Sequence, residues 1–507
     1  MKQIYNLVFV GVFCCLTTFA QQGTEVYLAN LDLNNDSLKI NGEINLSQNE
    51  GYDNQPSFFS DNKILFSSTR KRQTDIALYD LIDKTTTWLS NTPNGSEYSP
   101  LKIPGRDAVS AVRLDEDGLQ RLYEYDLKTG DSKVLIPNLK VGYHVWYSND
   151  IIVCTVLIEN RMDLVVYNLK ENTNYTVQKN VGRSLHKIPN SELISFIAKV
   201  GENATITSLN PYSKEKKNIT TLLGDSEDVT WTTDGSLITA YNKYLFSFKP
   251  SIDTEWKSLF EFQQTDIHGI SRLAVSPNGK FISFVSKDAP YKIVQKQVET
   301  FNARDLEAFA NCYSEEVLVK NFSKDTISVG REQLKEGYDA FYKRTPAVEV
   351  KVSSRIVINS TVIDQEFVSI GDKQKQQVAI YETDGLIKTM TFIRDKKTTF
   401  DPEVIVQKQL DAYNSRDIDG FLATYSTQAK ILSYSGELRS DGTDAMRAGY
   451  TDFFNSAPDL HCEIINRIVI GNKVIDEESI TANGNTFKAV AIYEVENNEI
   501  VKVTFVN

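Results

Sequence analysis

Short runs of alternating apolar and polar residues fill the first half of the chain. Alternation with period two predicts β-strands, and clusters of Gly, Asn, Asp and Ser between the runs predict turns. In one hairpin, Phe58-Phe59 and Ile64-Leu65-Phe66 flank an Asp61-Asn62 turn. These strands continue to Ser286 and group into units of about 40 to 45 residues, which is the period of a β-propeller blade.

The arrangement of the units predicts how the ring closes. Five full units are followed by a last one, Ser271 to Ser286, that has only two strands. Two N-terminal strands, Glu25 to Leu31 and Glu43 to Ser47, supply the missing half. A ring closed by both ends of the chain leaves no free sheet edge. We therefore expect an all-β, six-bladed propeller over residues 23–288.

Particular residues of these blades resemble a known repeat. The run SDNKILFSSTR at 60–70, followed by Asp75 and Leu78-Tyr79, resembles the PD40-type repeat of TolB-like propellers. The run SPNGK at 276–280, followed by Phe284, is similar. The resemblance covers about half of the chain. It implies a ring that binds a protein or glycan partner, and it implies no chemistry.

After Ala289-Pro290 the apolar period becomes that of helices. A helix is predicted from Tyr291, Asp305 is expected to cap a short second helix, and a third is predicted over 331–343. Strands are then predicted over 348–358, 362–370, 376–382 and 387–393. Helices followed by an antiparallel meander are typical of an α+β domain.

The same pattern returns 112 positions later, beginning with the run VQKQ at Val294–Gln297 and again at Val406–Gln409. The alignment needs no gap until the hairpin after Glu382, where one residue is inserted. Other matched pairs are Asn302 and Asn414, Arg304 and Arg416, Asp305 and Asp417, Tyr338 and Tyr450, and Arg355 and Arg467. A fixed offset over so many positions predicts a tandem duplication, with domains at 291–397 and 402–507.

The segments FNARDLEAF (301–309) and YNSRDIDGF (413–421), together with the order of elements, resemble a second family. They are similar to the SnoaL-like and ketosteroid-isomerase-like superfamily, which has the cone-shaped, cystatin-like curved sheet of nuclear transport factor 2. That fold hosts enzymes, binders and scaffolds alike. The resemblance implies a pocket for a small apolar ligand, or pairing of the two copies through their open sheet faces.

The isomerases of this superfamily use a carboxylate base, a tyrosine and a protonated aspartate. By alignment these roles fall near Asn321 and Ser433, Gln297 and Gln409, and Val378 and Val490. None of these side chains supplies the required acid or base at neutral pH. The sequence therefore assigns no catalytic residue and disfavours an isomerase mechanism.

Matched acids on one predicted strand are the remaining candidates. In both copies an Asp and a Glu lie two residues apart and so share one sheet face. If that face lines the cone, the paired carboxylates can bind a cation or act as acid and base; if it faces water, they are ordinary surface acids. Two matched tyrosines either line the pocket or fill the core. The pocket candidates are therefore Asp364, Glu366, Tyr381, Asp476, Glu478 and Tyr493.

Composition excludes several other classes. A net charge of −12 and a pI of about 5.1 argue against a nucleic-acid partner. The four histidines are widely spaced, so no metal site is expected, and no cofactor-binding motif is present. Lys2, the apolar run Ile4 to Phe19 and the small residue Ala20 predict a secretory signal over residues 1–20. This favours a periplasmic or secreted protein over a lipoprotein or a membrane-spanning one.

Two functions remain open. The first is a binding protein whose propeller holds a protein or glycan and whose two cones hold a small apolar ligand or each other. The alternative is an enzyme that acts on a small organic molecule in one or both cones through the Asp-x-Glu strand. The empty isomerase positions favour the binding protein.

Overall fold

The computed structural model describes residues 23–34, 37–71, 73–201, 203–264, 266–322 and 325–506. It divides into two compact units, the first ending at Phe262 and resuming over Gly269–Lys287, the second formed by Gln263–His268 and Asp288–Asn507. The predicted signal segment lies outside the described residues. Within the described part, no helix combines the length and apolarity needed to cross a membrane.

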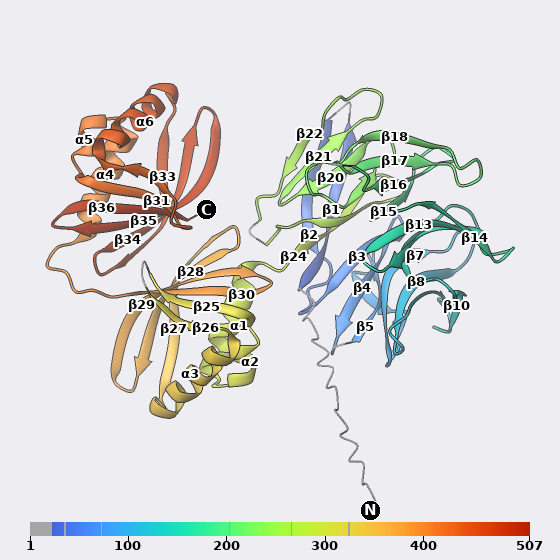
Figure 1. The fold of residues 1–507 in the computed structure, drawn as a ribbon, viewed down its shortest axis with the longest axis horizontal. Helices are drawn as coiled ribbons and strands as arrows, with labels where there is room; N and C mark the ends of the chain where they lie inside the picture. Colours follow the sequence, from blue (N-terminus) through green and yellow to red (C-terminus); the bar gives the residue numbers. More distant parts are fainter. Residues whose placement is uncertain are drawn as a thin grey trace, which may run out of the picture. The chain divides into compact units, whose positions relative to one another are not determined.

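The described residues of the first unit form six antiparallel sheets of four strands each. Figure 1 draws this unit in blue to yellow-green. Five of these sheets are formed by strands that follow one another along the chain. The first two contain β3 (Asp53–Ser60), β4 (Lys63–Arg70), β5 (Gln73–Asp80) and β6 (Thr85–Trp88), then β7 (Gly95–Lys102), β8 (Ala108–Asp115), β9 (Gln120–Asp126) and β10 (Ser132–Ile136). The next three contain β11 (Val141–Trp146), β12 (Ile151–Ile158), β13 (Arg161–Asn168) and β14 (Thr173–Gln178), then β15 (Val181–Lys187), β16 (Ile194–Ala198), β17 (Thr205–Leu209) and β18 (Lys216–Thr221), then β19 (Val229–Trp231), β20 (Leu237–Tyr241), β21 (Tyr244–Phe248) and β22 (Lys257–Glu261).

The sixth sheet joins the two ends of the unit, as the sequence predicted. Its order is β2-β1-β24-β23. The antiparallel ladder between β1 and β24 places Val26 opposite Val285 and Leu28 opposite Ser283. The strands are β1 (Thr24–Asn34), β2 (Ser37–Asn45), β23 (Ser271–Val275) and β24 (Phe281–Lys287). The first unit is therefore an all-β, six-bladed propeller.

Apolar side chains between neighbouring blades form the propeller core. Val26 and Leu28 of the closing blade pack in one cluster with Ile64 and Phe66 of the next blade, and all four are buried. Because side chains alternate between the two faces of a strand, each blade presents apolar residues to both of its neighbours. This explains why the central strands read as nearly continuous apolar runs.

In its described residues, the second unit contains two α+β domains, each with three helices and one six-stranded sheet. The first consists of α1 (Pro290–Asn302), α2 (Leu306–Ala310), β25 (Tyr313–Asn321), β26 (Thr326–Val329), α3 (Arg331–Arg344), β27 (Val348–Ile358), β28 (Thr361–Ile370), β29 (Lys373–Asp384) and β30 (Leu386–Arg394). The second consists of α4 (Pro402–Asn414), α5 (Ile418–Leu422), β31 (Tyr425–Ser433), β32 (Leu438–Asp441), α6 (Gly442–Ser456), β33 (His461–Ile470), β34 (Lys473–Ala482), β35 (Asn485–Glu496) and β36 (Glu499–Val506).

The two sheets have the same strand order, β26-β25-β30-β29-β28-β27 and β32-β31-β36-β35-β34-β33. The predicted meander accounts for four strands of each sheet. The apolar pattern did not predict the other two strands, which are β25 and β26 in the first domain and β31 and β32 in the second. β25 pairs in parallel with β30, so its place in the sheet depends on a partner strand far along the chain.

The residues matched between the copies hold the helices in place. Asp305 caps α2, as predicted, because its side chain accepts a hydrogen bond from the Ala308 amide. The Asn302 side chain exchanges two hydrogen bonds of 2.8 Å with the Val350 backbone. Arg304 donates to the backbone carbonyl of Tyr342 at 2.7 Å. These matched residues therefore have a structural role.

The two α+β domains pack against each other through the sheet faces that point away from their helices. One buried cluster, here called the sheet-pairing cluster, contains Ile356, Ile363, Val378, Ile380 and Ile393 from the first domain and Ile468, Ile470, Ile475, Val490, Ile492 and Val506 from the second. The hydroxyl of Ser354 bonds to the side chain of Asn466, its equivalent 112 positions later, at 3.1 Å. Equivalent residues that meet each other are the mark of an isologous, twofold interface.

Candidate functional site

Strand β28 divides its side chains between two environments. Ile363 belongs to the sheet-pairing cluster, whereas Val362 packs with Val294 and Val298 of α1. Asp364 and Glu366 have the same parity as Val362 and therefore lie on the helix-facing side, where they are 0% and 2% exposed. All six candidates are buried, so none is an ordinary surface residue: Asp364, Glu366, Tyr381, Asp476, Glu478 and Tyr493.

The two acids of β28 nevertheless have separate partners. Asp364 binds Arg355 through two parallel hydrogen bonds, each 2.7 Å long, and Arg355 also donates to Gln295 of α1 at 3.1 Å. Burial raises the pKa of Asp364, and the guanidinium opposes that rise. The second domain repeats this pair, with distances of 2.7 and 2.8 Å between Arg467 and Asp476. Asp364 therefore links β28 to β27 through Arg355 and is not available to act together with Glu366 as a carboxylate pair.

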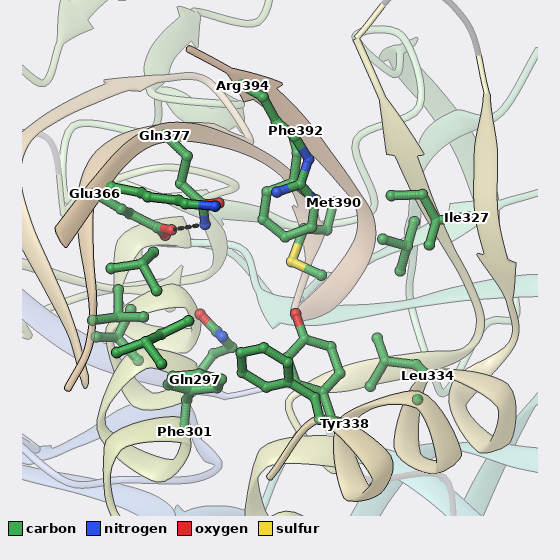
Figure 2. A pocket seen from close by; sticks show the side chains of 18 of the residues that line it. Gln297, Phe301, Ile327, Leu334, Tyr338, Glu366, Gln377, Met390, Phe392 and Arg394 are labelled. Carbon is green, nitrogen blue, oxygen red and sulfur yellow. Dashed lines mark hydrogen bonds between the residues drawn. The ribbon is translucent and has the colours of Figure 1, made fainter. Parts of the chain in front are cut away.

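Glu366 faces a different set of groups (Figure 2). The Tyr381 hydroxyl lies 2.9 Å from Glu366 Oε1 and 3.3 Å from Gln297 Oε1. The Gln377 amide donates to Glu366 Oε2 at 2.7 Å, the contact drawn as a dashed line in Figure 2. These residues come from β28, β29 and α1, so the sheet and a helix together position the carboxyl group.

Burial raises the pKa of Glu366 to about 7, and the nearby Asp364 charge adds to the rise, while the Gln377 and Tyr381 hydrogen bonds oppose it. The protonated form of Glu366 is also compatible with the hydrogen bonds among Glu366, Tyr381 and Gln297. A protonated Glu366 can donate to the Tyr381 oxygen, which leaves the Tyr381 proton free for Gln297. Near neutral pH the group can therefore accept or release a proton.

The second domain keeps the acid and the tyrosine and lacks the amide. The Tyr493 hydroxyl donates to Glu478 at 2.9 Å, and burial raises the pKa of Glu478 to about 7. Opposite Glu478 on β35 stands Ala489, at the position that Gln377 holds in the first domain. The carboxyl group of the second domain thus has one fewer donor.

A cavity of about 1200 Å³ lies between the sheet and the helices of the first domain. Figure 2 shows Glu366 and Gln377 on one side of it, and Phe301 and Tyr338 rising from the helices. Most of the inner wall is apolar, formed by Val298, Phe301, Val319, Leu334, Val350, Val368, Met390 and Phe392. A space of this size holds a small organic molecule, and Glu366, Gln297 and Tyr381 are among the buried polar groups of its wall.

The equivalent cavity of the second domain has a volume of only about 300 Å³. Leu410 and Ile480 line it where the first domain has Val298 and Val368. Each of these replacements adds a methylene group to the wall. Larger side chains at these two wall positions thus accompany the smaller volume of the second cavity, although its acid and tyrosine are retained.

Several lining residues were not singled out from the sequence. Tyr338 was noted only because Tyr450 matches it, and Gln297 only as a position that has lost an isomerase tyrosine. Met390 lines the cavity beside Phe392 (Figure 2), and no sequence signal separates it from an ordinary core methionine. The match between Tyr338 and Tyr450 could have indicated the pocket, because both copies keep this polar aromatic residue as well as the acids.

The propeller has a smaller polar cavity, of about 100 Å³, lined by the innermost strands of its blades. Buried Asp228 accepts two hydrogen bonds from Arg183, at 3.0 Å from Nε to Oδ1 and at 2.5 Å from Nη2 to Oδ2, and lies 3.6 Å from Arg272. The two guanidinium groups outweigh burial and lower the pKa of Asp228. This network fills the hub with paired charges and leaves little room for a ligand.

The titration of Glu366 predicts a pH-dependent stability. Its folded-state pKa of about 7 lies above the ordinary glutamate value of 4.5, so the stabilisation from the neutral acid is complete below the unfolded pKa and is lost as the pH rises through 7. Glu366→Gln does not titrate. Relative to the native chain, the variant should gain about 2 kcal/mol of unfolding free energy between about pH 5 and about pH 8.

Urea unfolding of both proteins at the two pH values measures this difference. Glu437→Gln, an exposed position of the second domain, is the matched control and should show no pH-dependent gain. A constant offset between Glu366→Gln and the native chain would contradict the raised pKa.

Comparisons with known proteins give partial likenesses. No curated protein matches the chain. A TolB from Acinetobacter baumannii is 12% identical, with a TM-score of 0.36, and the match covers 52% of this chain and 64% of that protein. A cystatin fold protein from Novosphingobium aromaticivorans is 23% identical, with a TM-score of 0.21 and a match over 21% of this chain and 99% of that protein. An NTF2-like protein from Cytophaga hutchinsonii is 18% identical, with a TM-score of 0.19, over 22% of this chain and 92% of that protein.

The family match falls in the second α+β domain. The first domain lies outside the matched residues, and its assignment to the same family stays a prediction that rests on the shared strand order and the offset of 112 positions. Residues 406–503 match the family model described as SnoaL-like domain, and the second α+β domain is thus a SnoaL-like domain.

Proposed function

We propose that this chain is a binding protein whose first α+β domain holds a small, largely apolar organic molecule. The observation that carries this proposal is the cavity of about 1200 Å³ with its apolar wall and one buried acid, Glu366. Binding sites for small molecules are typically apolar cavities in which a few polar groups fix orientation. Here Glu366, Tyr381 and Gln377 form such a set.

The second domain has a different role in this proposal. It descends from the same ancestor by tandem duplication and serves mainly as the partner that covers the outer sheet face of the first. Its narrow cavity and its share of the sheet-pairing cluster support this division. The chain then contains both halves of an arrangement that otherwise needs two subunits.

Filling the first cavity should weaken binding. Val298→Leu combined with Val368→Ile introduces the side chains that Leu410 and Ile480 already provide at the equivalent positions of the second domain. The affinity of the full chain for the neutral fluorophore 1-N-phenylnaphthylamine should fall about tenfold, since each methylene displaces ligand from apolar contact worth about 0.8 kcal/mol. Fluorescence titration measures the change.

Val329→Leu is the matched control, because Val329 is exposed and does not line the cavity. It should bind the probe as the native chain does. A native chain that shows no saturable binding of the fluorophore would contradict the proposal, as would equal affinities for the native chain and the filled variant.

Proton transfer is a second candidate function, favoured by the pKa of about 7 of Glu366 and by the Tyr381 hydroxyl 2.9 Å away. A buried acid that titrates near neutrality beside a hydroxyl donor is suited to moving a proton next to a carbonyl group. The relevant unit is Glu366 with Tyr381, since Arg355 holds Asp364. Exchange of α-hydrogens for deuterium in a panel of small ketones, followed by NMR, tests this function. Exchange that persists in Glu366→Gln would exclude it.

We also infer that the propeller holds a protein or glycan partner on its surface and that the chain is exported to the periplasm or secreted. The small, charge-filled hub cavity supports contact through the outer loops rather than through an internal ligand. The apolar run that ends at Ala20 supports export. Sequencing of the mature N-terminus should give Gln21, and an intact Met1 would contradict export by this signal.

A further inference from the structure

The mouth of the first cavity is rich in positive charge. Arg344, Lys375, Arg394 and Lys397 line its rim and are exposed, against the two acids Glu336 and Asp395. Within the part of the chain that the structure describes, none of these four cations has an acidic partner within 4 Å. With four cations against two acids, the rim therefore carries a net positive charge.

Arg394 connects this rim to the interior. Its guanidinium carbon lies 5.3 Å from the centre of the Phe392 ring, which forms part of the wall. Figure 2 shows Arg394 beside Phe392 and Met390, on a different side of the cavity from Glu366. Burial raises the pKa of Tyr338, and the positive charge of Arg394 opposes that rise. The field of Arg394 thus reaches a group inside the cavity.

The cavity has two polar regions, Glu366 in the interior and the cations at the rim, and they favour ligand groups of different charge. A ligand carboxylate beside Glu366 would raise the cost of ionising either acid, because like charges in a buried site repel. A carboxylate at the rim instead faces Arg394 and Lys375 and stays partly hydrated. The apolar wall between the two regions accepts hydrocarbon.

We infer that the ligand is an anionic amphiphile, a carboxylic acid with an extended apolar body. The hydrocarbon lies along Val298, Phe301 and Leu334, and the carboxylate lies at the rim against Arg394 and Lys375. This inference rests on the proposed function, and it adds the charge and the orientation of the ligand. Exposed Ile327 and Ile370 at the same rim provide apolar contact for the part of the body nearest the head group.

Competition with the neutral fluorophore tests the charge. Dodecanoate, dodecanol and dodecylamine have the same apolar body and differ in head group. At low ionic strength the full chain should bind dodecanoate about tenfold more tightly than dodecanol, and dodecylamine most weakly. In Arg394→Ala/Lys375→Ala, the affinities for dodecanoate and dodecanol should come within about twofold of each other, while the affinity for dodecanol stays close to the native value.

Lys388→Ala is the matched control, since Lys388 is an exposed cation of β30 that does not line the cavity. It should keep the native preference for dodecanoate. Equal affinities for the three amphiphiles in the native chain would overturn the inferred ligand class and leave cavity binding intact. A preference that persists in Arg394→Ala/Lys375→Ala would overturn the assignment to this rim. Failure of the fluorophore itself to bind would instead contradict the proposed function.

Discussion

Ile475→Asp is expected to destabilise the second unit by about 4 kcal/mol or more. Ile475 is 0% exposed within the sheet-pairing cluster. Its equivalent, Ile363, belongs to the same cluster. A carboxylate at this position loses its hydration and is surrounded by apolar side chains. The apolar contacts that Ile475 makes with both sheets are lost at the same time. The effect should be large because one substitution disturbs the shared core of two domains.

Urea unfolding gives the free energy, and limited proteolysis reports on the pairing. If the two sheets separate, the segment that connects the domains, residues 395–401, should become more susceptible to cleavage. Ile465→Asp is the matched control, since Ile465 is 51% exposed on β33 of the same domain. It should cost less than about 0.5 kcal/mol. Similar losses in the two variants would show that the cluster does not hold the sheets together.

Arg355→Met should cost about 3 kcal/mol at neutral pH. The substitution keeps most of the side-chain volume and removes both 2.7 Å hydrogen bonds to Asp364, which is 0% exposed. An uncompensated carboxylate in this position has its pKa raised further above the value of the unfolded chain. The loss of stability should therefore shrink as the pH falls towards about 4, because Asp364 of the folded variant is then protonated and that of the unfolded chain is about half protonated.

A double substitution distinguishes the net stability that the Arg355–Asp364 ion pair contributes from the destabilisation caused by leaving Asp364 without its partner. Arg355→Met/Asp364→Leu replaces both charged groups with apolar ones and should recover most of the stability lost by Arg355→Met, because buried ion pairs contribute little net stability. Urea unfolding of the single and double variants at about pH 4 and about pH 7 provides the comparison. A single variant that loses as much at the lower pH as at the higher would rule out the buried aspartate as the cause.

Much of the architecture was predictable because it depends on local and repeated signals. Alternation of apolar residues marked the blade strands, and the two-strand unit ending at Ser286 required the N-terminal strands for closure, as the β1–β24 ladder confirms. Asp305 was predicted to cap α2 from its position alone, and it does. In contrast, β25 and β26 were missed. The place of β25 in the sheet comes from the distant strand β30, and no local pattern reports such a partner.

For the candidate site, alternation along a strand placed Asp364 and Glu366 on one face, and this is correct. Alternation could not predict that Arg355 would bind Asp364. Nor could it predict that Tyr381 and Gln377 would contact Glu366. Those contacts join residues 9 to 15 positions apart along the chain across neighbouring strands. Periodicity reports the face of a side chain and carries no information about its neighbours in space.

The repeated offset and the alternation of apolar residues were therefore enough to establish a ring of blades followed by two α+β domains. The chemistry of those domains came from packing in three dimensions. Val298 and Leu410 look interchangeable in an alignment, yet a few such differences accompany cavities of about 1200 Å³ and about 300 Å³. Cavity volume depends on how all the walls meet, and the ionisation of Glu366 depends on how completely those walls exclude water.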